Sequence, residues 1–320
     1  MSHIQKKILV IKLGALGDFI QAASPFNAIR LHHSAENITL LTSPDFMALA
    51  NSSPWFDHVK IDYKPNALQI KKWLSLRKWM RSSGFTRVYD LQTSDRSNFY
   101  HKMMRPLNKL NPKPDWSGNA RDCSHPHNNI HRDSMHTIER QKEQLHLAGI
   151  NNVPPVDLSW INADIRKFGL QNTFVLLVPG GAAHRPAKRW PGEYYQQLIQ
   201  YFASKKIQVV LIGGKEEISL LNELSTTDPI CISLAGATNL FDLFSLARNS
   251  LVVIGNDTGP MHVAAVSGCK TIVLYSSESD PTLCAQRGDD VTIFRKNNLF
   301  DLNPTQIIKH LTQVLGSNQT

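Results

Sequence analysis

Short, almost wholly apolar runs at regular intervals constrain the fold of this chain more than any other feature. In the second half they occupy residues 174–178, 208–212, 251–254 and 271–275, and segments with helical periodicity alternate with them. Strands this apolar are typical of parallel sheets that are covered on both faces. Their alternation with helices indicates βαβ units. The second half is therefore predicted to be a doubly wound α/β domain.

The first half repeats this alternation in a weaker form. Its apolar runs lie at residues 8–13, 38–41, 59–61 and 88–91. Periodicity predicts one helix over 18–31 and another over 135–148. The stretch between Asp95 and Met135 is rich in Asn, Pro, Arg and His, so we expect long loops there.

The length of 320 residues suits two domains of about 150 residues each. Pro154 and Pro155 are typical of a hinge, which places an N-terminal domain at 1–155 and a C-terminal domain at 156–305. A terminal helix within 306–320 could pack back toward the N-terminal domain. The predicted architecture is α/β, with two Rossmann-like, doubly wound domains facing across a cleft and ligands at the carboxyl ends of the strands.

The composition favours a folded cytoplasmic protein. Hydrophobic residues make up 42 % of the chain and charged residues 19 %, which argues against wholesale disorder. No apolar run approaches the roughly 18 residues of a membrane span, and the opening residues lack a signal-peptide pattern. The four cysteines include no C-x-x-C pair, which favours free thiols in a reducing compartment.

The net charge of +9 lies almost entirely in the first half. Residues 1–160 hold 21 Lys and Arg against 13 Asp and Glu, an excess of 8, whereas residues 161–320 hold 14 against 13, an excess of 1. We therefore expect an anionic partner for the first half. Nucleic acid, a phosphorylated glycolipid and an anionic membrane surface would all satisfy this charge.

Asp18 follows the first apolar run, at the end of a Gly-Ala-Leu-Gly turn. A carboxylate at the carboxyl end of a strand would face the predicted cleft, where it could take a proton from an attacking hydroxyl. Asp is also a favoured helix N-cap, and a helix is expected to begin here. The residues alone leave both roles open.

A glycine-containing loop follows the apolar run that ends at Val178. It contains Gly180 and Gly181 and leads to Lys188 and Arg189, just before a predicted helix. Flexible backbone and two cations beside a helix N-terminus suit a diphosphate, and either cation could stabilise a departing nucleotide. The alternative is a solvated basic turn.

The stretch over residues 253–268 carries the most information. A buried strand leads directly into Asp257, Thr258 and Gly259, and His262 lies in the first turn of the helix that follows. Small residues let a ligand approach the backbone, and a helix N-terminus favours phosphate. The alternative makes Asp257 or Thr258 a helix cap and His262 a structural histidine.

A weaker signal lies over residues 211–217. The strand ends near Gly213, and Glu216 or Glu217 could accept hydrogen bonds from ribose hydroxyls. A solvated helix start is the alternative for these two carboxylates.

The segment over residues 68–81 mixes aromatic, apolar and basic side chains. It includes Lys71, Lys72, Trp73, Arg77 and Lys78. Such a helix could lie at a membrane interface and help to meet an anionic glycolipid. It could equally be a packed amphipathic helix with solvated lysines.

These motifs, in this order, resemble those of glycosyltransferase family nine, the ADP-heptose:lipopolysaccharide heptosyltransferases. The resemblance extends over the whole chain and is specific in three places. These are the G-x-x-G-D turn that ends at Asp18, the PAKRWP string at 186–191 and NDTGPMHVAA at 256–265.

The resemblance implies a role for each matching residue. Asp18 matches the family's catalytic aspartate, and Lys188 matches the lysine at the donor diphosphate. Asp257 and His262 match donor-pocket residues, with the amides of Thr258 and Gly259 near phosphate. Either Glu216 or Glu217 matches the ribose-contacting glutamate. The family implies the GT-B fold, inversion at the anomeric carbon and no bound metal.

The resulting hypothesis is an inverting transfer of heptose from ADP-heptose to a lipopolysaccharide core intermediate. ADP-heptose is then a co-substrate, and no cofactor, metal or nucleic acid is expected. The protein would be cytoplasmic, with peripheral contact at the inner membrane. Two rivals stay open: a nucleotide-sugar epimerase of the same architecture, and a nucleotide-sugar binding protein without catalysis.

Overall fold

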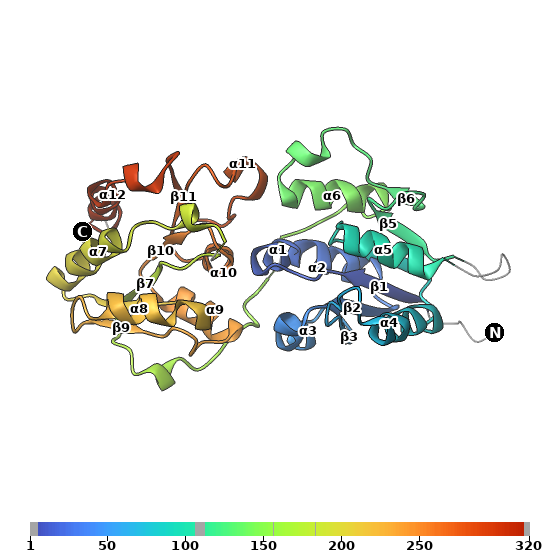
Figure 1. Cartoon of the computed structure of the whole chain (residues 1–320), viewed down its shortest axis with the longest axis horizontal. Helices are drawn as coiled ribbons and strands as arrows, with labels where there is room; N and C mark the ends of the chain where they lie inside the picture. Colours follow the sequence, from blue (N-terminus) through green and yellow to red (C-terminus); the bar gives the residue numbers. More distant parts are fainter. Residues whose placement is uncertain (1–5, 106–112, 156, 183, 317–320) are drawn as a thin grey trace. The chain divides into compact units, whose positions relative to one another are not determined.

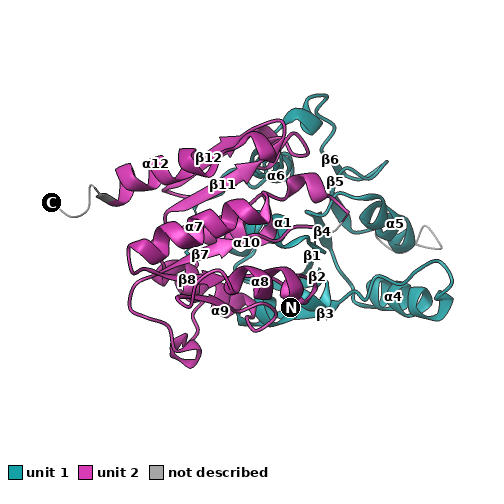
Figure 2. Cartoon of the chain, turned by 60° about the vertical axis from the view of Figure 1, so that its left-hand side comes forward, with its two compact units in different colours: residues 1–157 teal, residues 158–320 magenta. Residues whose placement is uncertain are grey.

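The computed structural model describes residues 6–105, 113–155, 157–182 and 184–316. The chain divides into two compact units, Met1–Asp157 and Leu158–Thr320 (Figure 2). Val156, where the second domain was expected to begin, lies outside the described residues, as do residues 1–5 and the last four residues of the predicted terminal segment.

The first unit contains a six-stranded parallel sheet in the order β3-β2-β1-β4-β5-β6 (Figure 1). This is the strand order of a dinucleotide-binding fold, in which the winding reverses between β1 and β4. The strands are β1 (Lys7–Ile11), β2 (Asn37–Thr42), β3 (His58–Ile61), β4 (Arg87–Asp90), β5 (Asp115–Gly118) and β6 (His125–Pro126). The helices are α1 (Leu16–Gln21), α2 (Ala23–His32), α3 (Met47–Ser52), α4 (Ile70–Ser82), α5 (Asp95–Met104) and α6 (Thr137–Leu147).

The turn after β1 depends on Gly14, whose φ is +106°, a conformation that other residues rarely adopt. A Cβ atom there would also lie 2.7 Å from the ring of Phe46. The helix predicted over 18–31 is in fact two helices, with the break at Ala22. Pro25 explains the break, because it has no N–H to continue the hydrogen bonding of α1.

The prediction of long loops between Asp95 and Met135 was wrong for part of this segment, and residues 106–112 of it lie outside the described residues. The segment contains α5, β5 and β6. The side chain of Ser94 caps α5, and the buried face of that helix carries Ser97, Tyr100 and His101 besides two methionines. Because this face mixes polar with apolar side chains, it gives no clear apolar periodicity in the sequence.

The second unit repeats the topology, with a six-stranded parallel sheet in the order β12-β11-β10-β7-β8-β9. The strands are β7 (Phe174–Val178), β8 (Gln208–Leu211), β9 (Cys231–Ser233), β10 (Val253–Asn256), β11 (Thr271–Tyr275) and β12 (Val291–Arg295). The helices are α7 (Gly192–Ser204), α8 (Ile218–Ser225), α9 (Leu240–Asn249), α10 (Gly259–Val266), α11 (Pro281–Cys284) and α12 (Pro304–Gly316). The four predicted strands of this half and their alternation with helices are confirmed, and β9, α11 and β12 are additional.

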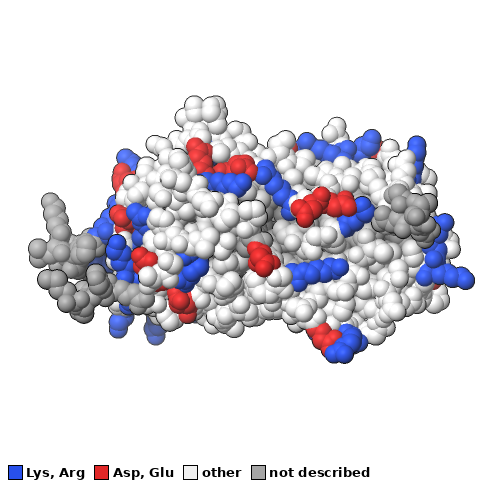
Figure 3. Space-filling view, turned by 180° about the vertical axis from the view of Figure 1, so that it is seen from behind, with Lys and Arg blue, Asp and Glu red and all other residues white. Residues whose placement is uncertain are grey.

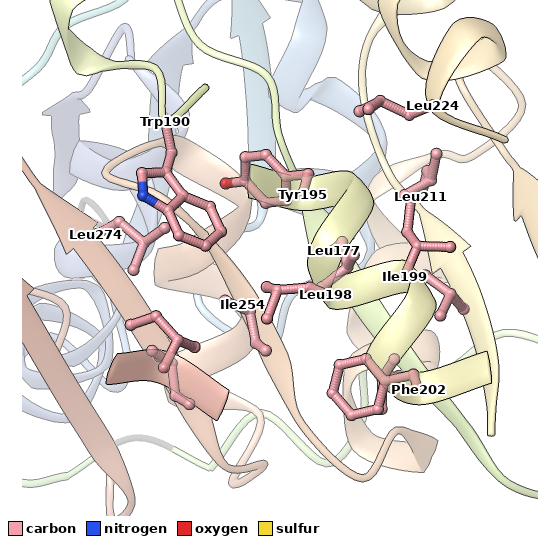
Figure 4. Close-up of a cluster of buried hydrophobic side chains, with 14 of the residues drawn as sticks. Leu177, Trp190, Tyr195, Leu198, Ile199, Phe202, Leu211, Leu224, Ile254 and Leu274 are labelled. Carbon is pink, nitrogen blue, oxygen red and sulfur yellow. The ribbon is translucent and has the colours of Figure 1, made fainter. Parts of the chain in front are cut away.

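The core of the second unit lies between its sheet and α7, where Trp190 and Tyr195 pack edge to face with ring centroids 5.0 Å apart (Figure 4). Ile307 and Leu311 of α12 are fully buried in the same core. The terminal helix is thus a structural part of the second unit and packs on α7. The terminal helix therefore belongs to the second unit and is not the separate segment expected over 306–320, and its packing toward the N-terminal domain stays a prediction.

All four cysteines are free, as expected from their spacing. Across the described ranges, every helix is too short or too polar to cross a lipid bilayer.

Candidate functional site

Three neighbouring strands of the second unit bring their carboxyl ends to one pocket. They are β10, β7 and β8, and this is the edge at which doubly wound sheets bind ligands. The pocket has a volume of about 470 Å³ and is lined by Val178, Gly180, Gly181, Ala182, Gly214, Lys215, Glu216, Glu217, Thr258 and Pro260. Five residues of the predicted donor site therefore meet here: Gly180, Gly181, Glu216, Glu217 and Thr258.

Glu217 links two loops of this pocket through hydrogen bonds. One carboxylate oxygen accepts a hydrogen bond from the Gly181 N–H at 2.7 Å, and the other accepts one from the Gly214 N–H at 2.6 Å. A Cβ atom at Gly180 would lie 1.7 Å from Oε1 of Glu217, and one at Gly213 would lie 2.7 Å from its Oε2. Both positions therefore require glycine while this carboxylate is in place.

The two glutamates that the sequence could not separate have different surroundings. Glu217 is engaged with two backbone amides, whereas Glu216 is exposed and lines the pocket. Glu216 is therefore the better candidate for a ribose contact, because its oxygens are accessible to a ligand.

Asn256, at the end of β10, positions the loops of the site, and sequence reasoning gave this first residue of the 256–265 motif no role. Its fully buried amide nitrogen donates to the carbonyls of Pro179 at 2.7 Å and Gly180 at 3.0 Å. Its Oδ1 accepts from the backbone N–H of Trp190 at 3.0 Å and from the hydroxyl of Tyr195 at 3.1 Å. The amide thereby ties the glycine loop to the start of α7. The motif alone does not show whether Asn256 has this structural role or contacts a ligand.

Arg189 also supports the glycine loop. Its Nε donates to the carbonyl of Gly181 at 3.1 Å, and its Nη2 donates to the same oxygen. Sequence reasoning placed Arg189 at the donor phosphates, but among the described residues it is not one of those that line the pocket. In this structure its guanidinium fixes the backbone of the loop.

Lys188 is held by a network centred on Asp257. The Lys188 ammonium lies 2.6 Å from Oδ2 of Asp257, which also accepts from the hydroxyl of Ser279 at 2.7 Å. Oδ1 accepts from the Gln286 amide at 2.9 Å, and the Tyr275 hydroxyl in turn donates to that amide at 2.8 Å. Burial raises the pKa of Asp257, but the hydrogen bonds from Lys188 and Ser279 outweigh it and hold the pKa below its ordinary value. No motif had marked Ser279 or Gln286.

The N-terminus of α10 borders the same pocket. Thr258 is its N-cap and makes no side-chain cap hydrogen bond, since its hydroxyl donates to the carbonyl of Asn256 at 3.2 Å. Gly259 is the first helical residue, where backbone N–H groups have no partner within the helix. His262 is buried in the first turn, and of the described residues it is not among those that line the pocket.

Asp18 lies in the first turn of α1 in the first unit. Its Oδ2 accepts a hydrogen bond from the Ala15 N–H at 3.1 Å, so it caps the helix. The same half-buried side chain lines a pocket of about 170 Å³. The two roles that the sequence left open are therefore geometrically compatible.

The pocket beside Asp18 carries three cations and one carboxylate. It is lined by Lys12, Asp18, Leu91, Gln92, Thr93, Arg132, Thr137, Arg140, Gln141 and Gln144. The Lys12 ammonium donates to the carbonyl of Leu91 at 3.0 Å. Burial lowers the pKa of Lys12, although the charges of Asp18 and Asp90 act in the opposite direction. Sequence reasoning missed these cations, because Arg132 and Arg140 belong to no recognised motif.

The basic helix over 70–82 is α4. Lys71, Lys72 and Lys78 are exposed on it, and Arg77 is half-buried. Figure 3 shows Lys and Arg side chains spread over one face of the molecule, with Asp and Glu side chains among them. Exposed apolar side chains accompany the lysines of α4: Tyr63, Leu68, Ile70 and Leu74.

Trp73 does not belong to this exposed surface. Its indole N–H donates to the carbonyl of Asn66 at 2.9 Å, and its ring packs against Phe99 and Tyr100. The guanidinium of Arg96 covers the ring at 5.1 Å. Trp73 thus anchors α4 to α5, which corrects its assignment to the acceptor or membrane side.

In the described ranges, no three His, Cys, Asp or Glu side chains are grouped so as to hold a metal ion.

Comparison with known proteins places the chain in a family. Residues 73–309 match the family model for glycosyltransferase family 9 (heptosyltransferase). Over 159 residues the chain is 29 % identical to lipooligosaccharide heptosyltransferase 2 of Haemophilus influenzae, a match that covers 42 % of this chain and 46 % of that protein. The chain thus spans about half the length of this relative.

Solved structures share the fold. The Escherichia coli ADP-heptose lps heptosyltransferase II matches with a TM-score of 0.79 and 21 % identity, over 98 % of this chain and 100 % of that chain. A family 9 glycosyl transferase from Veillonella parvula gives 0.82 and 19 %, with 99 % of each chain covered. The two Rossmann-like domains of the predicted α/β architecture are confirmed, and their arrangement across a cleft stays a prediction. Because the family model matches well over half of the chain, this protein belongs to glycosyltransferase family 9.

Proposed function

We propose that this protein transfers heptose from ADP-heptose to a lipopolysaccharide core intermediate, with inversion at the anomeric carbon. The observation that carries the proposal is the second-unit pocket, where glycine-rich backbone, Glu216 and the N-terminus of α10 line one cavity. Family membership supports it, as does the similarity to a lipooligosaccharide heptosyltransferase.

The donor nucleotide would bind in this pocket. The amides at the start of α10 and the backbone of Gly180 and Gly181 suit a diphosphate, and Glu216 suits a ribose. Lys188, positioned by Asp257, would stabilise the negative charge that develops on the leaving ADP. This arrangement would need no metal ion, because the ammonium and the helix amides supply the positive charge.

Asp18 would act as the general base. The acceptor oxygen forms a bond to the anomeric carbon of heptose while the bond from that carbon to the diphosphate oxygen breaks. The acceptor proton passes to Asp18, and the electron pair of the broken bond leaves with ADP. A half-buried carboxylate that lines a pocket is suited to this proton transfer.

The exposed surface of α4 would contact anionic lipid on the cytoplasmic face of the inner membrane. Ile70 and Leu74 lie one turn apart and are more than half exposed, on the same face as Lys71 and Lys78. Apolar side chains among lysines are typical of interfacial helices. This contact would bring the protein to its glycolipid acceptor without a membrane-spanning segment.

Mass spectrometry of the products tests the proposal. The protein is incubated with ADP-heptose and heptose-deficient lipopolysaccharide, and one heptose should be added to the glycolipid with release of ADP. The anomeric configuration of the product, read by NMR, should be opposite to that of the donor. Formation of an altered nucleotide sugar without acceptor would favour an epimerase. Binding of ADP-heptose without any product would favour a protein that has lost catalysis.

A parallel incubation after exhaustive EDTA treatment tests the metal-free scheme. Full transfer is expected, because the proposed charge stabilisation comes from Lys188 and backbone amides. Loss of transfer that magnesium or manganese restores would contradict this part of the proposal.

A further inference from the structure

Two glutamines one turn apart on α6 lie in the wall of the pocket beside Asp18, but within the described part of the chain only the side chain of Gln144 has hydrogen-bond partners. The Gln144 amide donates to the carbonyls of Asp90 at 2.9 Å and Ser117 at 3.3 Å. Gln141 is 4 % exposed, and among the described residues neither its Oε1 nor its Nε2 has a partner. Burying an amide in this way is unfavourable unless another group completes its hydrogen bonds. Gln141 therefore points to a ligand.

Arg132 likewise has a buried donor without a partner in the described residues, here on a charged side chain. Its Nη2 donates to the hydroxyl of Thr93 at 2.8 Å, and its Nη1 donates to the exposed Asp133 at 3.1 Å. Its Nε is buried and, within the described residues, has no partner. Thr93 and Asp133 thus hold the two terminal nitrogens of the guanidinium, and Nε can still donate to a further acceptor.

Arg140 adds a second guanidinium to the same pocket. It donates to the Thr137 hydroxyl at 3.3 Å. Burial and the neighbouring Arg132 lower the pKa of Arg140, while Asp133 and Asp18 act in the opposite direction. Thr137, Arg140 and Gln141 all belong to the first turns of α6, where the backbone also favours negative charge.

We infer that this pocket binds an anionic oxygen group of the acceptor, a carboxylate or a phosphate, between the guanidinium groups of Arg132 and Arg140 and the amide of Gln141. The inference rests on the proposed function and deepens it. Planar guanidinium groups recognise such oxygens with paired hydrogen bonds. A group held there would place a neighbouring sugar hydroxyl beside Asp18. Acceptor selection would then depend on this built site and not only on the surface charge of α4.

Kinetics with matched variants provide the first test. Arg140→Met and Gln141→Leu keep most of the side-chain volume and remove the donors. Lys142→Met is the control, because Lys142 lies on the same helix, pairs with Glu139 and is absent from the pocket lining. We expect the acceptor KM to rise about 10- to 100-fold in Arg140→Met and about 3- to 10-fold in Gln141→Leu. ADP affinity should stay the same in both, and the control should behave as wild type.

Modified acceptors identify the anion. One has its sugar carboxylates reduced to alcohols, and the other has its phosphates removed. The wild type should lose activity on one of the two, and Arg140→Met should no longer distinguish that acceptor from the unmodified one. If wild type and Arg140→Met discriminate equally, the inference is wrong. Should Arg140→Met fail to fold, Arg140→Lys keeps the charge, loses the paired donors and provides the same comparison.

A binding measurement separates this inference from the proposed function. Inorganic phosphate and glucuronate are titrated into the full chain by NMR, with no transfer required. Saturable binding that Arg140→Met and Gln141→Leu both weaken would support the anion site even if the protein transferred no sugar. Binding that neither variant changes, or no binding of either anion, would overturn the inference and leave the proposed function standing.

Discussion

The pockets of the two units differ in how their polar groups are satisfied. In the second unit, the side chains of Glu217, Asn256 and Asp257 are committed to hydrogen bonds with other parts of the same unit. In the first unit, the pocket beside Asp18 contains the buried amide of Gln141 and Nε of Arg132, which have no partners in the described residues.

This difference indicates that the two pockets recognise their ligands in different ways. The second-unit pocket is preorganised, because hydrogen bonds hold its loops in place before any ligand arrives. Lys188 is not among the described residues that line this pocket, and Asp257, next to Thr258 in the chain, holds it in place. The first-unit pocket is incomplete, because its donors need a further acceptor. A preorganised pocket suits a constant group such as a nucleotide diphosphate. A pocket of unsatisfied donors suits a partner that must bring a specific anionic group.

The largest expected effect follows from Asp18→Asn. The amide oxygen of Asn can still accept the hydrogen bond from Ala15, so α1 should stay capped, but the general base is lost. We expect turnover to fall about 10²-fold or more. Unchanged ADP binding and an unchanged circular dichroism spectrum are the controls. Near-normal turnover would reduce Asp18 to a helix cap.

Asp257→Asn tests the preorganised network of the second unit. Replacing the carboxylate leaves Lys188 without its ion-pair partner, so we expect a loss of about 2 kcal/mol in the stability of β10 and β11 at neutral pH. Hydrogen exchange of their amides measures this loss.

The pH dependence of this effect has a defined sign. Because the folded-state pKa of Asp257 lies below its ordinary value of 3.8, the stabilisation is complete above that value and disappears as the pH falls through the folded-state pKa. The difference between wild type and Asp257→Asn should therefore shrink below about pH 4. A difference that stays constant from pH 7 to pH 3 would mean that the Asp257 charge contributes nothing.

Lys188→Ala should weaken ADP binding about 10-fold and slow transfer as well, because a diphosphate charge is present in both donor and transition state. Calorimetry measures the first effect. Lys205→Ala is the matched control, since Lys205 is exposed at the C-terminal end of α7. If both variants bind ADP and transfer heptose like wild type, Lys188 has no part in the donor site.

The smallest effect is expected from neutralising the exposed cluster of α4. Replacing Lys71, Lys72, Arg77 and Lys78 by Gln should raise the acceptor KM a few-fold and reduce binding to anionic vesicles. Both effects should diminish as salt rises, because exposed charges are screened over about 8 Å at physiological ionic strength.

The control for the α4 variant carries the same charge change on the second unit, at Arg166, Lys205, Lys206 and Lys309. ADP affinity should be unaffected in both quadruple variants. If the α4 variant binds vesicles and acceptor like its control, the cluster is only a solvated surface.

The sequence predicted the second unit well because its signals are local. Strands such as β7 and β11 are continuous apolar runs, and the motifs of the donor site lie directly at strand ends. The first unit was predicted less well. The buried face of α5 includes Ser97 and His101, and β5 is only four residues long and contains Asp115 and Gly118, so neither element has an apolar pattern.

The site residues that sequence reasoning missed depend on contacts between distant segments. Gln286 reaches Asp257 from 29 residues away, and Arg132 reaches Thr93 from 39 residues away. No short motif can encode such pairs, because the fold alone brings them together. The roles of Arg189 and Glu217 were missed for the same reason. Their positions near the glycine loop were predicted, but the hydrogen bonds that fix the loop depend on its folded path.

Hydrogen–deuterium exchange of the full chain with and without ADP tests most directly whether the second unit binds the donor nucleotide. We expect ADP to give its strongest protection at residues 178–182, 213–217 and 257–262, with little change at the start of α6 and around Asp18. Strongest protection around Asp18 and α6, with none at the second-unit loops, would contradict the assignment of the donor to the second unit.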